Sequence, residues 1–210
     1  MGKGNLTLVL FLSVIFLLIF SMYRISQPRV LSIEEMKVNG FIKYGQYEEV
    51  RNFELIDHNN TKFSKENFAK NKLNLIYFGY TTCPTECPVM MSVMKSIYTK
   101  IDTENIQFYL ISFDPEIDTT QRLKDYVTAF DENFIGVTGK TPEILKLGYQ
   151  MGVEKLEPST NHQNHRVITH TNHLIAINSN TEIVGIFRGP FDSSAMSLSL
   201  IHISEPTRLV

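Results

Sequence analysis

Cys83 and Cys87 are the only cysteines in this chain of 210 residues, and three residues separate them in the sequence Cys-Pro-Thr-Glu-Cys-Pro. Two thiols at this spacing can act as a redox couple, bind a metal ion or close a single structural disulfide. The spacing excludes none of these, because residues about one helical turn apart can reach the Cα separation of a disulfide. The residues that can do chemistry are therefore concentrated in one short stretch.

The sequence around the cysteines predicts a strand, a two-thiol loop and then a helix. Leu75–Tyr80 is apolar and rich in β-formers, and Gly79 is expected to loosen the chain before the loop. Pro88 suits the first turn of a helix, which predicts Cys87 at the N-cap and Cys83 one turn earlier. Both sulfurs would then face unpaired N–H groups and the positive end of a helix dipole, which favour thiolates.

The rest of the chain predicts an α/β fold with a mixed sheet flanked by helices. Predicted strands alternate with predicted helices, as in parallel crossover units, and an N-terminal hairpin and a terminal antiparallel hairpin complete the sheet. The predicted strands are 47–57, 61–63, 106–113, 134–137, 174–178 and 183–187, and the predicted helices are 89–103, 119–130 and 141–151.

Histidines follow the cysteines at some distance in the sequence. His162 and His165 lie in the polar stretch Asn-His-Gln-Asn-His-Arg, which predicts a solvated loop, with auxiliary metal capture as the alternative. His170 lies near the entrance to the terminal hairpin, where a loop would approach the cysteines. His173 would point to the opposite face from His170 in an extended segment. His58, beside a predicted turn, is expected to be solvated.

The N-terminus carries an apolar run, Leu6–Phe20, interrupted by one Thr and one Ser. This run is just long enough to cross a bilayer, and no small-x-small cleavage site follows it. An uncleaved membrane anchor at residues 1–23 is therefore favoured over a cleaved signal, with a linker at 24–45. Lys3 on one side and two arginines on the other leave its orientation undecided.

Composition excludes one large class of partner. The formal net charge is −2, and no basic stripe interleaved with aromatic residues occurs, so we expect no nucleic-acid binding. The 43% apolar content supports one ordinary domain with a core, expected at residues 46–197.

Three stretches carry motifs: Phe78–Pro88 (FGYTTCPTECP), Ser112–Thr119 (SFDPEIDT) and Ala129–Gly139 (AFDENFIGVTG). Together they resemble the SCO/SenC family of copper-binding, thioredoxin-like proteins, and the similarity extends over roughly Gln46–Met196. The resemblance implies a thioredoxin-like fold and a membrane-anchored metallochaperone that assists assembly of the copper site of cytochrome c oxidase.

The resemblance also implies a ligand set. Cys83 and Cys87 match the family's two copper-binding cysteines. The family's histidine lies in a D-H-[ST] motif, and the matching triplet here is Thr169-His170-Thr171, so the ligand role passes to His170. Thr169 replaces the acidic residue of that motif. Two thiolates and one imidazole suit Cu(I), whereas zinc would prefer a fourth ligand.

Copper as Cu(I), and also Cu(II), is thus the implied metal. The implied partners are the copper-bearing subunit of cytochrome c oxidase, other copper carriers or thiol reductants, and the membrane. The implied location is the bacterial cytoplasmic membrane, with a single-pass anchor and the folded domain facing the periplasm.

Two other functions remain open at this point. Cys83 and Cys87 could be the redox pair of a thiol:disulfide oxidoreductase that keeps the cysteines of the copper-site protein reduced. Such reductases more often have two residues between the cysteines and a cis-proline before the terminal hairpin, and neither feature is found here. The third possibility is a structural or sensing domain in which the cysteines only form a bridge.

The end of the sequence has an unusual composition. Leu198–Arg208 (LSLIHISEPTR) resembles the translation of a sequencing-library adapter. We therefore expect residues 198–210 to be a non-native tail, attached to a helix that begins near Ser193, and His202 is left out of the candidate ligands.

Overall fold

The computed structural model describes residues 3–26, 31–101, 104–155, 159–160 and 166–204. The chain forms two compact units, Met1–Leu31 and Ser32–Val210. Each unit is described by itself. His162 and His165, predicted in a solvated loop, lie outside the described residues.

The described residues of the first unit form the helix α1 (Lys3–Ser26), whose large apolar side chains from Leu8 to Tyr23 are exposed. Crossing a bilayer requires about 20 consecutive apolar residues. Within the described residues, no helix is long and apolar enough to make that crossing. The transmembrane helix predicted for residues 1–23 is therefore not supported by the structure.

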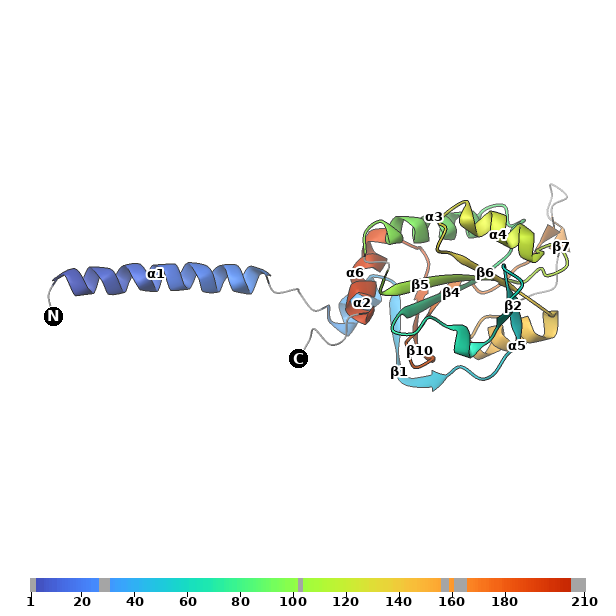
Figure 1. Cartoon of the computed structure of the whole chain (residues 1–210), viewed down its shortest axis with the longest axis horizontal. Coiled ribbons are helices and arrows are strands. Elements are labelled where there is room, and N and C mark those ends of the chain that lie inside the picture. Colours follow the sequence, from blue (N-terminus) through green and yellow to red (C-terminus); the bar gives the residue numbers. More distant parts are fainter. Residues whose placement is uncertain (1–2, 27–30, 102–103, 156–158, 161–165, 205–210) are drawn as a thin grey trace. The chain divides into compact units, whose positions relative to one another are not determined.

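The second unit is a mixed sheet with helices on both faces, which confirms the predicted α/β class (Figure 1). Its described residues place eight strands in the order β1-β10-β9-β4-β5-β6-β2-β3. The elements are α2 (Ile33–Val38), β1 (Phe41–Glu49), β2 (Leu55–Asp57), β3 (Lys62–Phe63), η1 (Lys65–Asn67), β4 (Leu73–Gly79), α3 (Glu86–Tyr98), β5 (Ile106–Ser112), α4 (Thr120–Thr128), β6 (Ile135–Thr138), α5 (Thr141–Gln150), β7 (Ser159–Thr160), β8 (Arg166–Val167), β9 (His173–Ile177), β10 (Glu182–Arg188) and α6 (Ser193–Ser204).

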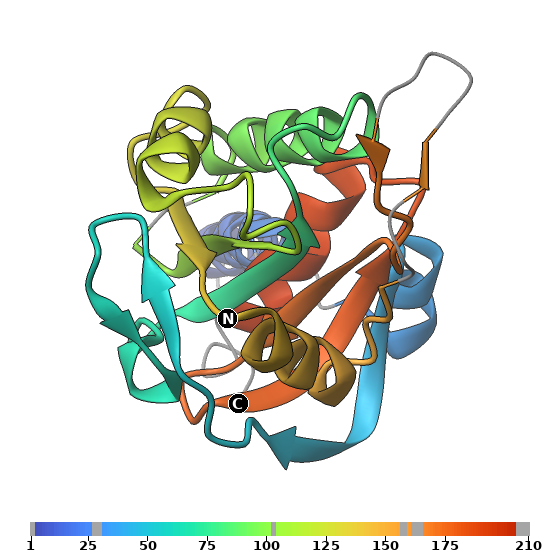
Figure 2. The same ribbon diagram turned by 90° about the vertical axis from the view of Figure 1, so that its right-hand side faces the viewer.

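The parallel strands β4, β5 and β6 lie in the interior of the sheet. All seven residues of β4 are buried, as expected for an apolar strand covered on both faces. α3 and α4 lie over one face of the sheet, and α5 lies over the other (Figure 2). The carboxyl ends of β4 and β5 therefore open next to each other, at the edge where α3 and α4 begin.

Much of the stretch 24–45, expected to be a linker, is folded. Ser32 and Glu35 exchange hydrogen bonds of 3.2 and 2.9 Å in a capping box at the start of α2. β1 pairs with β10 at the sheet edge, and the Phe41 and Phe187 ring centroids lie 4.8 Å apart. A local capping box therefore starts α2, whereas β1 is ordered by a distant strand that local periodicity does not reveal.

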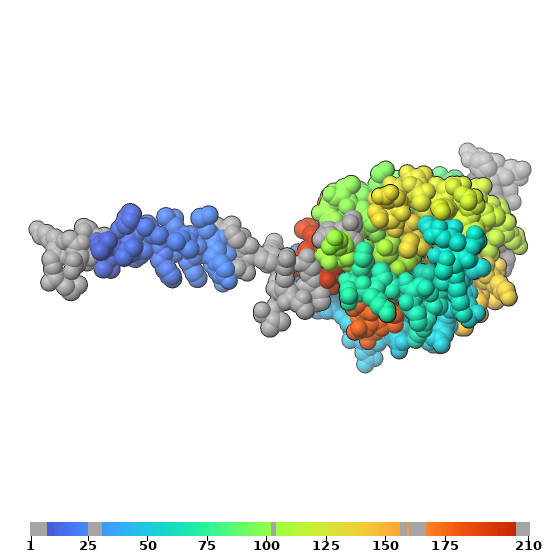
Figure 3. Space-filling model, viewed as in Figure 1, coloured from blue at the N-terminus to red at the C-terminus, as the bar shows by residue number. Residues whose placement is uncertain are grey.

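The predicted N-terminal hairpin is confirmed, with β2 and β3 paired antiparallel. Its first strand is shorter than the predicted 47–57, because β2 begins at Leu55 and residues up to Glu49 belong to β1. His58, expected to be solvated, is buried instead, and its Nδ1 accepts a 3.1 Å hydrogen bond from the Gly136 N–H. The hairpin turn also meets α4, where Lys124 Nζ donates to Asn59 Oδ1 at 3.0 Å. In the space-filling view these segments meet over one side of the unit (Figure 3).

The terminal hairpin of β9 and β10 is also confirmed, and α6 begins at Ser193 as predicted. α6 packs beside α3 and continues to Ser204, with Leu200 buried. It therefore extends into the segment 198–210, whose non-native origin stays a prediction. The short antiparallel pair β7 and β8, which was not predicted, precedes the His170 segment.

Candidate metal centre

The two cysteines lie where β4 ends and α3 begins, as the sequence predicted. Both are free thiols, Cys87 is fully buried and Cys83 is 8% exposed. α3 starts at Glu86 with Thr85 as its N-cap, so Cys87 lies in the first turn and not at the cap itself. Thr85 makes no capping hydrogen bond with its side chain; the Cys87 N–H donates to Cys83 Sγ at 3.4 Å instead. A sulfur thus satisfies one of the unpaired N–H groups at this helix end.

The two thiols have opposite acidities. A hydrogen bond from the Cys87 thiol, helped by backbone N–H groups including those of Thr85 and Glu86, lowers the pKa of Cys83 to about 5 against the opposing effect of burial. The same hydrogen bond to Cys83, together with burial and the nearby negative charge, raises the pKa of Cys87. The prediction that both sulfurs would favour the thiolate was therefore wrong for Cys87. Near neutral pH the pair holds one thiolate and one shared proton.

Gly79 makes room for the sulfur of Cys87. A Cβ at position 79 would lie 2.8 Å from Cys87 Sγ, 3.1 Å from the Tyr77 ring and 3.2 Å from a Leu110 methyl. Gly79 is the last residue of β4, so its function is close approach of the sulfur and not the chain loosening that was predicted. The sequence pattern Gly-x₃-Cys-x₃-Cys gives no hint of this contact.

Two tyrosines next to Gly79 extend the site and were missed by the sequence analysis. The Tyr77 hydroxyl donates to Asn172 Oδ1 at 2.9 Å and also interacts with Cys87; burial is the largest of the effects that raise its pKa. The Tyr80 hydroxyl accepts from the Ile168 N–H at 3.1 Å, and its pKa rises to about 12, chiefly by burial and further by Cys83. Polar-tipped aromatic residues in an otherwise apolar strand were the available signal.

His170 lies against these tyrosines. Its ring centroid is 5.5 Å from that of Phe113, 6.1 Å from Tyr77 and 6.4 Å from Tyr80. Nδ1 lies 3.0 Å from the Thr171 carbonyl oxygen, which can only accept a hydrogen bond, so Nδ1 carries the proton. In the neutral ring this tautomer leaves the lone pair on Nε2, the nitrogen that can then bind a metal.

Backbone contacts fix the His170 segment to the chain that follows α5. His170 forms an isolated antiparallel bridge with Lys155. Thr171 and Glu154 exchange two hydrogen bonds, 2.9 Å from Thr171 N–H to the Glu154 carbonyl and 3.1 Å from Glu154 N–H to Thr171 Oγ1. His173 lies further on, at the start of β9 opposite Arg188, and its pKa is lowered by burial and then by Arg188.

The structure thus brings the two sulfurs together and places His170 beside the tyrosines that contact them. Across the described part of the chain, no three His, Cys, Asp or Glu side chains come close enough together to hold a metal ion. The donor chemistry nevertheless fits a soft cation, because one thiolate, one acidifiable thiol and one Nε2 lone pair are soft or borderline ligands.

Comparison with known proteins gives the family. The model of the SCO1/SenC family matches residues 43–203. A Stutzerimonas stutzeri protein named for copper binding is 29% identical over 158 residues, covering 74% of this chain and 76% of its own length. An SCO2-like protein of Rickettsia felis is 39% identical over 94 residues, covering 44% of this chain and 45% of its own. The chain thus spans three quarters of the first relative but less than half of the second.

Solved structures agree with this match. Copper-bound ScoI of Bradyrhizobium japonicum is 26% identical with a TM-score of 0.62, covering 73% of this chain and 99% of its own. Copper-bound ScoI of Arabidopsis thaliana is 23% identical with a TM-score of 0.68, covering 78% and 100%. These matches confirm the predicted thioredoxin-like mixed sheet. Since the family model covers more than half of the sequence, the chain belongs to the SCO1/SenC family.

Proposed function

We propose that this domain is a copper carrier that binds copper through Cys83, Cys87 and His170 and assists assembly of the copper site of cytochrome c oxidase. The observation that carries the proposal is the pair of reduced, hydrogen-bonded sulfurs together with an imidazole whose Nδ1 faces a backbone carbonyl, which leaves Nε2 as the nitrogen for a metal. The copper-bound Bradyrhizobium relative and the name of the Stutzerimonas relative support copper as the cargo.

Copper binding has a defined proton balance. Cys83 is already a thiolate near neutral pH, whereas Cys87 keeps its proton. Cu(I) therefore replaces the proton between the two sulfurs: one proton leaves Cys87, two Cu–S bonds form, and His170 adds a neutral nitrogen ligand. Because no three potential ligand side chains converge among the described residues, His170 would have to move towards the two sulfurs when copper binds.

The proposed recipient is the copper-bearing subunit of the oxidase, on the periplasmic side of the bacterial cytoplasmic membrane. One related protein, BsSco, is a member of the Sco family of cytochrome c oxidase assembly proteins, and a related SCO1/SenC family protein of Bacillus anthracis is a lipoprotein. Other copper carriers or small thiols would supply the metal and keep both sulfurs reduced.

The test is Cu(I) stoichiometry and affinity of the reduced protein, measured by competition with a strong Cu(I) chelator. Wild type should hold one copper. Cys83→Ser and Cys87→Ser should each lose tight binding, because a single thiolate and an imidazole leave copper open to competing thiols. A single-cysteine variant that still retained one copper against the chelator would refute the shared site.

A second function, thiol:disulfide exchange, is favoured by the unequal acidities of the pair. The Cys83 thiolate would attack a partner disulfide and form a mixed disulfide. The Cys87 sulfur would then displace the partner, its proton passing to the leaving thiolate, so that two electrons reduce the partner and a Cys83–Cys87 disulfide remains. Cys83 is suited to the attack because it is the more exposed and more acidic of the two.

His170→Ala separates these functions. Thiol exchange does not need an imidazole ligand, so reduction of a partner disulfide should stay within a few-fold of wild type, while metallation of an oxidase copper domain from the loaded protein should collapse. Intact metallation by His170→Ala, or restoration of oxidase assembly by copper-free reduced protein alone, would favour the reductase over the copper carrier.

A further inference from the structure

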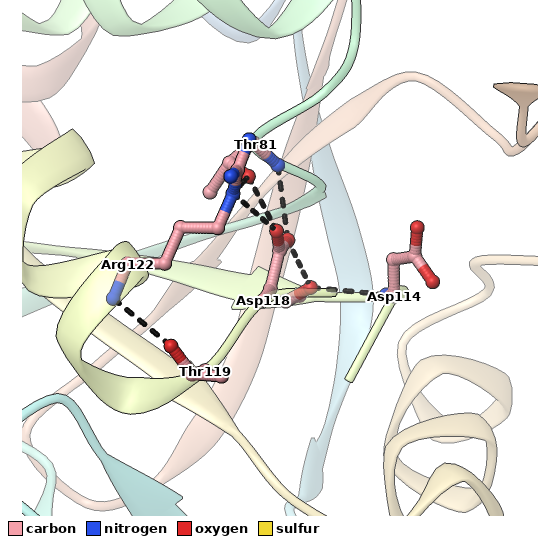
Figure 4. A network of polar contacts seen from close by, with 6 residues as sticks. Thr81, Asp114, Asp118, Thr119 and Arg122 are labelled. Atoms are coloured by element: carbon pink, nitrogen blue, oxygen red, sulfur yellow. Dashed lines mark hydrogen bonds and ion pairs between the residues drawn. The ribbon is translucent and has the colours of Figure 1, made fainter. Parts of the chain in front are cut away.

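A buried carboxylate lies beside the cysteine loop. Asp118 is 0% exposed and belongs to the loop between β5 and α4. Figure 4 shows its side chain at the centre of a polar network that reaches Thr81 and Arg122. A buried charge is costly unless it is fully hydrogen-bonded, so its partners indicate what it is for.

Both oxygens of Asp118 are occupied by donors. Oδ2 accepts from the Thr81 N–H at 2.9 Å and from Ser112 Oγ at 2.6 Å. Oδ1 accepts a short hydrogen bond from the Thr81 hydroxyl and lies 3.7 Å from Arg122 Nε. Arg122 Nε also donates to Thr81 Oγ1 at 2.6 Å, so the Thr81 hydroxyl links the guanidinium to the carboxylate. An acceptor-only group matches this set of donors, whereas an amide would not.

The network joins the ends of two neighbouring parallel strands. Ser112 is the last residue of β5, and Thr81 is the second residue after β4. Thr81 also stands two residues before Cys83, whose N–H bonds to the Tyr80 carbonyl at 3.2 Å. Asp118 therefore holds both hydrogen-bond donors of Thr81, the residue from which the chain turns towards Cys83. Cys83 Sγ in turn accepts a hydrogen bond of 3.4 Å from the Cys87 N–H at the start of α3.

We propose that Asp118, acting through Thr81, is a positioning residue that fixes the Cys83 sulfur relative to Cys87. This inference rests on the proposed copper-binding function of the two cysteines. Asp118 does not touch the metal; its carboxylate sets the backbone conformation at Thr81, and the turn at residues 80–83 transmits that conformation to the sulfur. Arg122 strengthens the arrangement by orienting the Thr81 hydroxyl.

The decisive variants are Thr81→Val and Thr81→Ser in the full chain. Valine has the shape of threonine and keeps the backbone N–H that donates to Asp118, but it has no hydroxyl to donate to Asp118 or to accept from Arg122, whereas serine keeps both hydroxyl contacts. We expect Thr81→Val to weaken Cu(I) binding by about tenfold or more, the usual effect of losing a residue that orients a ligand, and Thr81→Ser to stay within about threefold of wild type. Asp118→Asn should resemble Thr81→Val.

Asp125→Asn is the control. Asp125 lies exposed on α4, and its side chain accepts a hydrogen bond from the Gln121 side chain.

A readout without copper keeps the inference separate from the proposed function. The equilibrium of the Cys83–Cys87 pair with glutathione depends on how the two sulfurs are held, and Thr81→Val should change its equilibrium constant by about threefold or more while Thr81→Ser should not. Equal copper affinities and equal redox equilibria for folded Thr81→Val and wild type would overturn the inference. If wild type bound no Cu(I), the proposed function would fail, and the redox comparison alone would decide whether Asp118 positions Cys83. Should Asp118→Asn fail to fold, the Thr81 pair gives the answer.

Discussion

The cysteine loop and the His170 segment both contribute to the proposed copper site, but they are held in different ways. The loop is held by the buried end of β4, by the hydrogen bonds of Asp118 to Thr81 and by the hydrogen bond from the Cys87 N–H to Cys83 Sγ. His170 is fixed by a backbone bridge to Lys155, by the Thr171–Glu154 hydrogen bonds and by aromatic contacts. The sulfur pair is therefore assembled in the folded protein, whereas the third ligand must still approach it.

His58 and His170 also differ in which ring nitrogen carries the proton. His58 Nδ1 accepts a hydrogen bond from a backbone N–H, so its proton lies on Nε2. His170 Nδ1 faces a carbonyl oxygen, so its proton lies on Nδ1 and Nε2 keeps the lone pair. His58 contacts β6, whereas His170 lies beside the tyrosines that contact the sulfurs, so only His170 of these two is a candidate ligand.

We expect the largest effect from Gly79→Ala, which disturbs the cysteine loop. Its new Cβ would lie 2.8 Å from Cys87 Sγ, and so the sulfur or the strand end must move. We expect a loss of about 1–3 kcal/mol in the free energy of unfolding, as for other overpacked cores, and loss of tight Cu(I) binding. Chemical denaturation and chelator competition measure both.

Gly45→Ala is the matched control, because a Cβ at position 45 meets no atom within 4 Å. It should leave both measurements unchanged. Normal copper affinity in Gly79→Ala would mean that the close contact with Cys87 is irrelevant to the site.

The second prediction tests the contribution of His170. His170→Ala should weaken Cu(I) retention by about one to a few orders of magnitude without changing the fold, because it removes one of three ligands and leaves the sulfur pair intact. His173→Ala, on β9 opposite Arg188, is the comparison variant and should do little. A larger loss with His173→Ala would transfer the ligand role to that residue.

We expect a smaller effect of acidic pH on the stability of the fold, through His58. Burial, the largest influence, lowers the pKa of His58, so the unfolded chain binds its proton more readily than the folded one. Stability is therefore fully present above the unfolded pKa of about 6.5 and falls as the pH drops below it. The cost should be about 1 kcal/mol, the value of the Gly136–His58 hydrogen bond that protonation breaks.

His58→Asn places a non-titrating acceptor near the position of Nδ1. Unfolding curves at pH 7.5 and 5.5 should show a weaker pH dependence in His58→Asn than in wild type. Identical pH dependence in the two proteins would exclude His58 as a source of acid sensitivity.

The smallest signal is a proton count. Because Cys83 is ionised and Cys87 protonated near neutral pH, Cu(I) loading should release about one proton per copper. Calorimetry in buffers of different ionisation enthalpy measures this number. Release of two protons would show that both sulfurs are thiols before copper arrives, contrary to the acidities described for the loop.

The sequence patterns predicted most helices and strands correctly where their formation depends on neighbouring residues. The apolar run before the cysteines forms β4, the periodic apolar stretch after them forms α3, and the helix near Ser193 begins where expected. The prediction differed where order comes from distant residues: β1 is ordered by pairing with β10, and His58 is buried by contact with β6. Local periodicity carries no information about such partners.

For the candidate site, the sequence by itself determined that two thiols flank the start of a helix, and the resemblance of its motifs singled out His170. Only the tertiary structure decided that the thiols differ in acidity, that Gly79 makes space for a sulfur, and that Asp118 holds Thr81 from 37 positions away. The physical reason is the distance along the chain over which each property is determined. Helix and strand formation depend on neighbours along the chain, whereas acidity, close packing and buried hydrogen bonds depend on which distant groups share the same small volume.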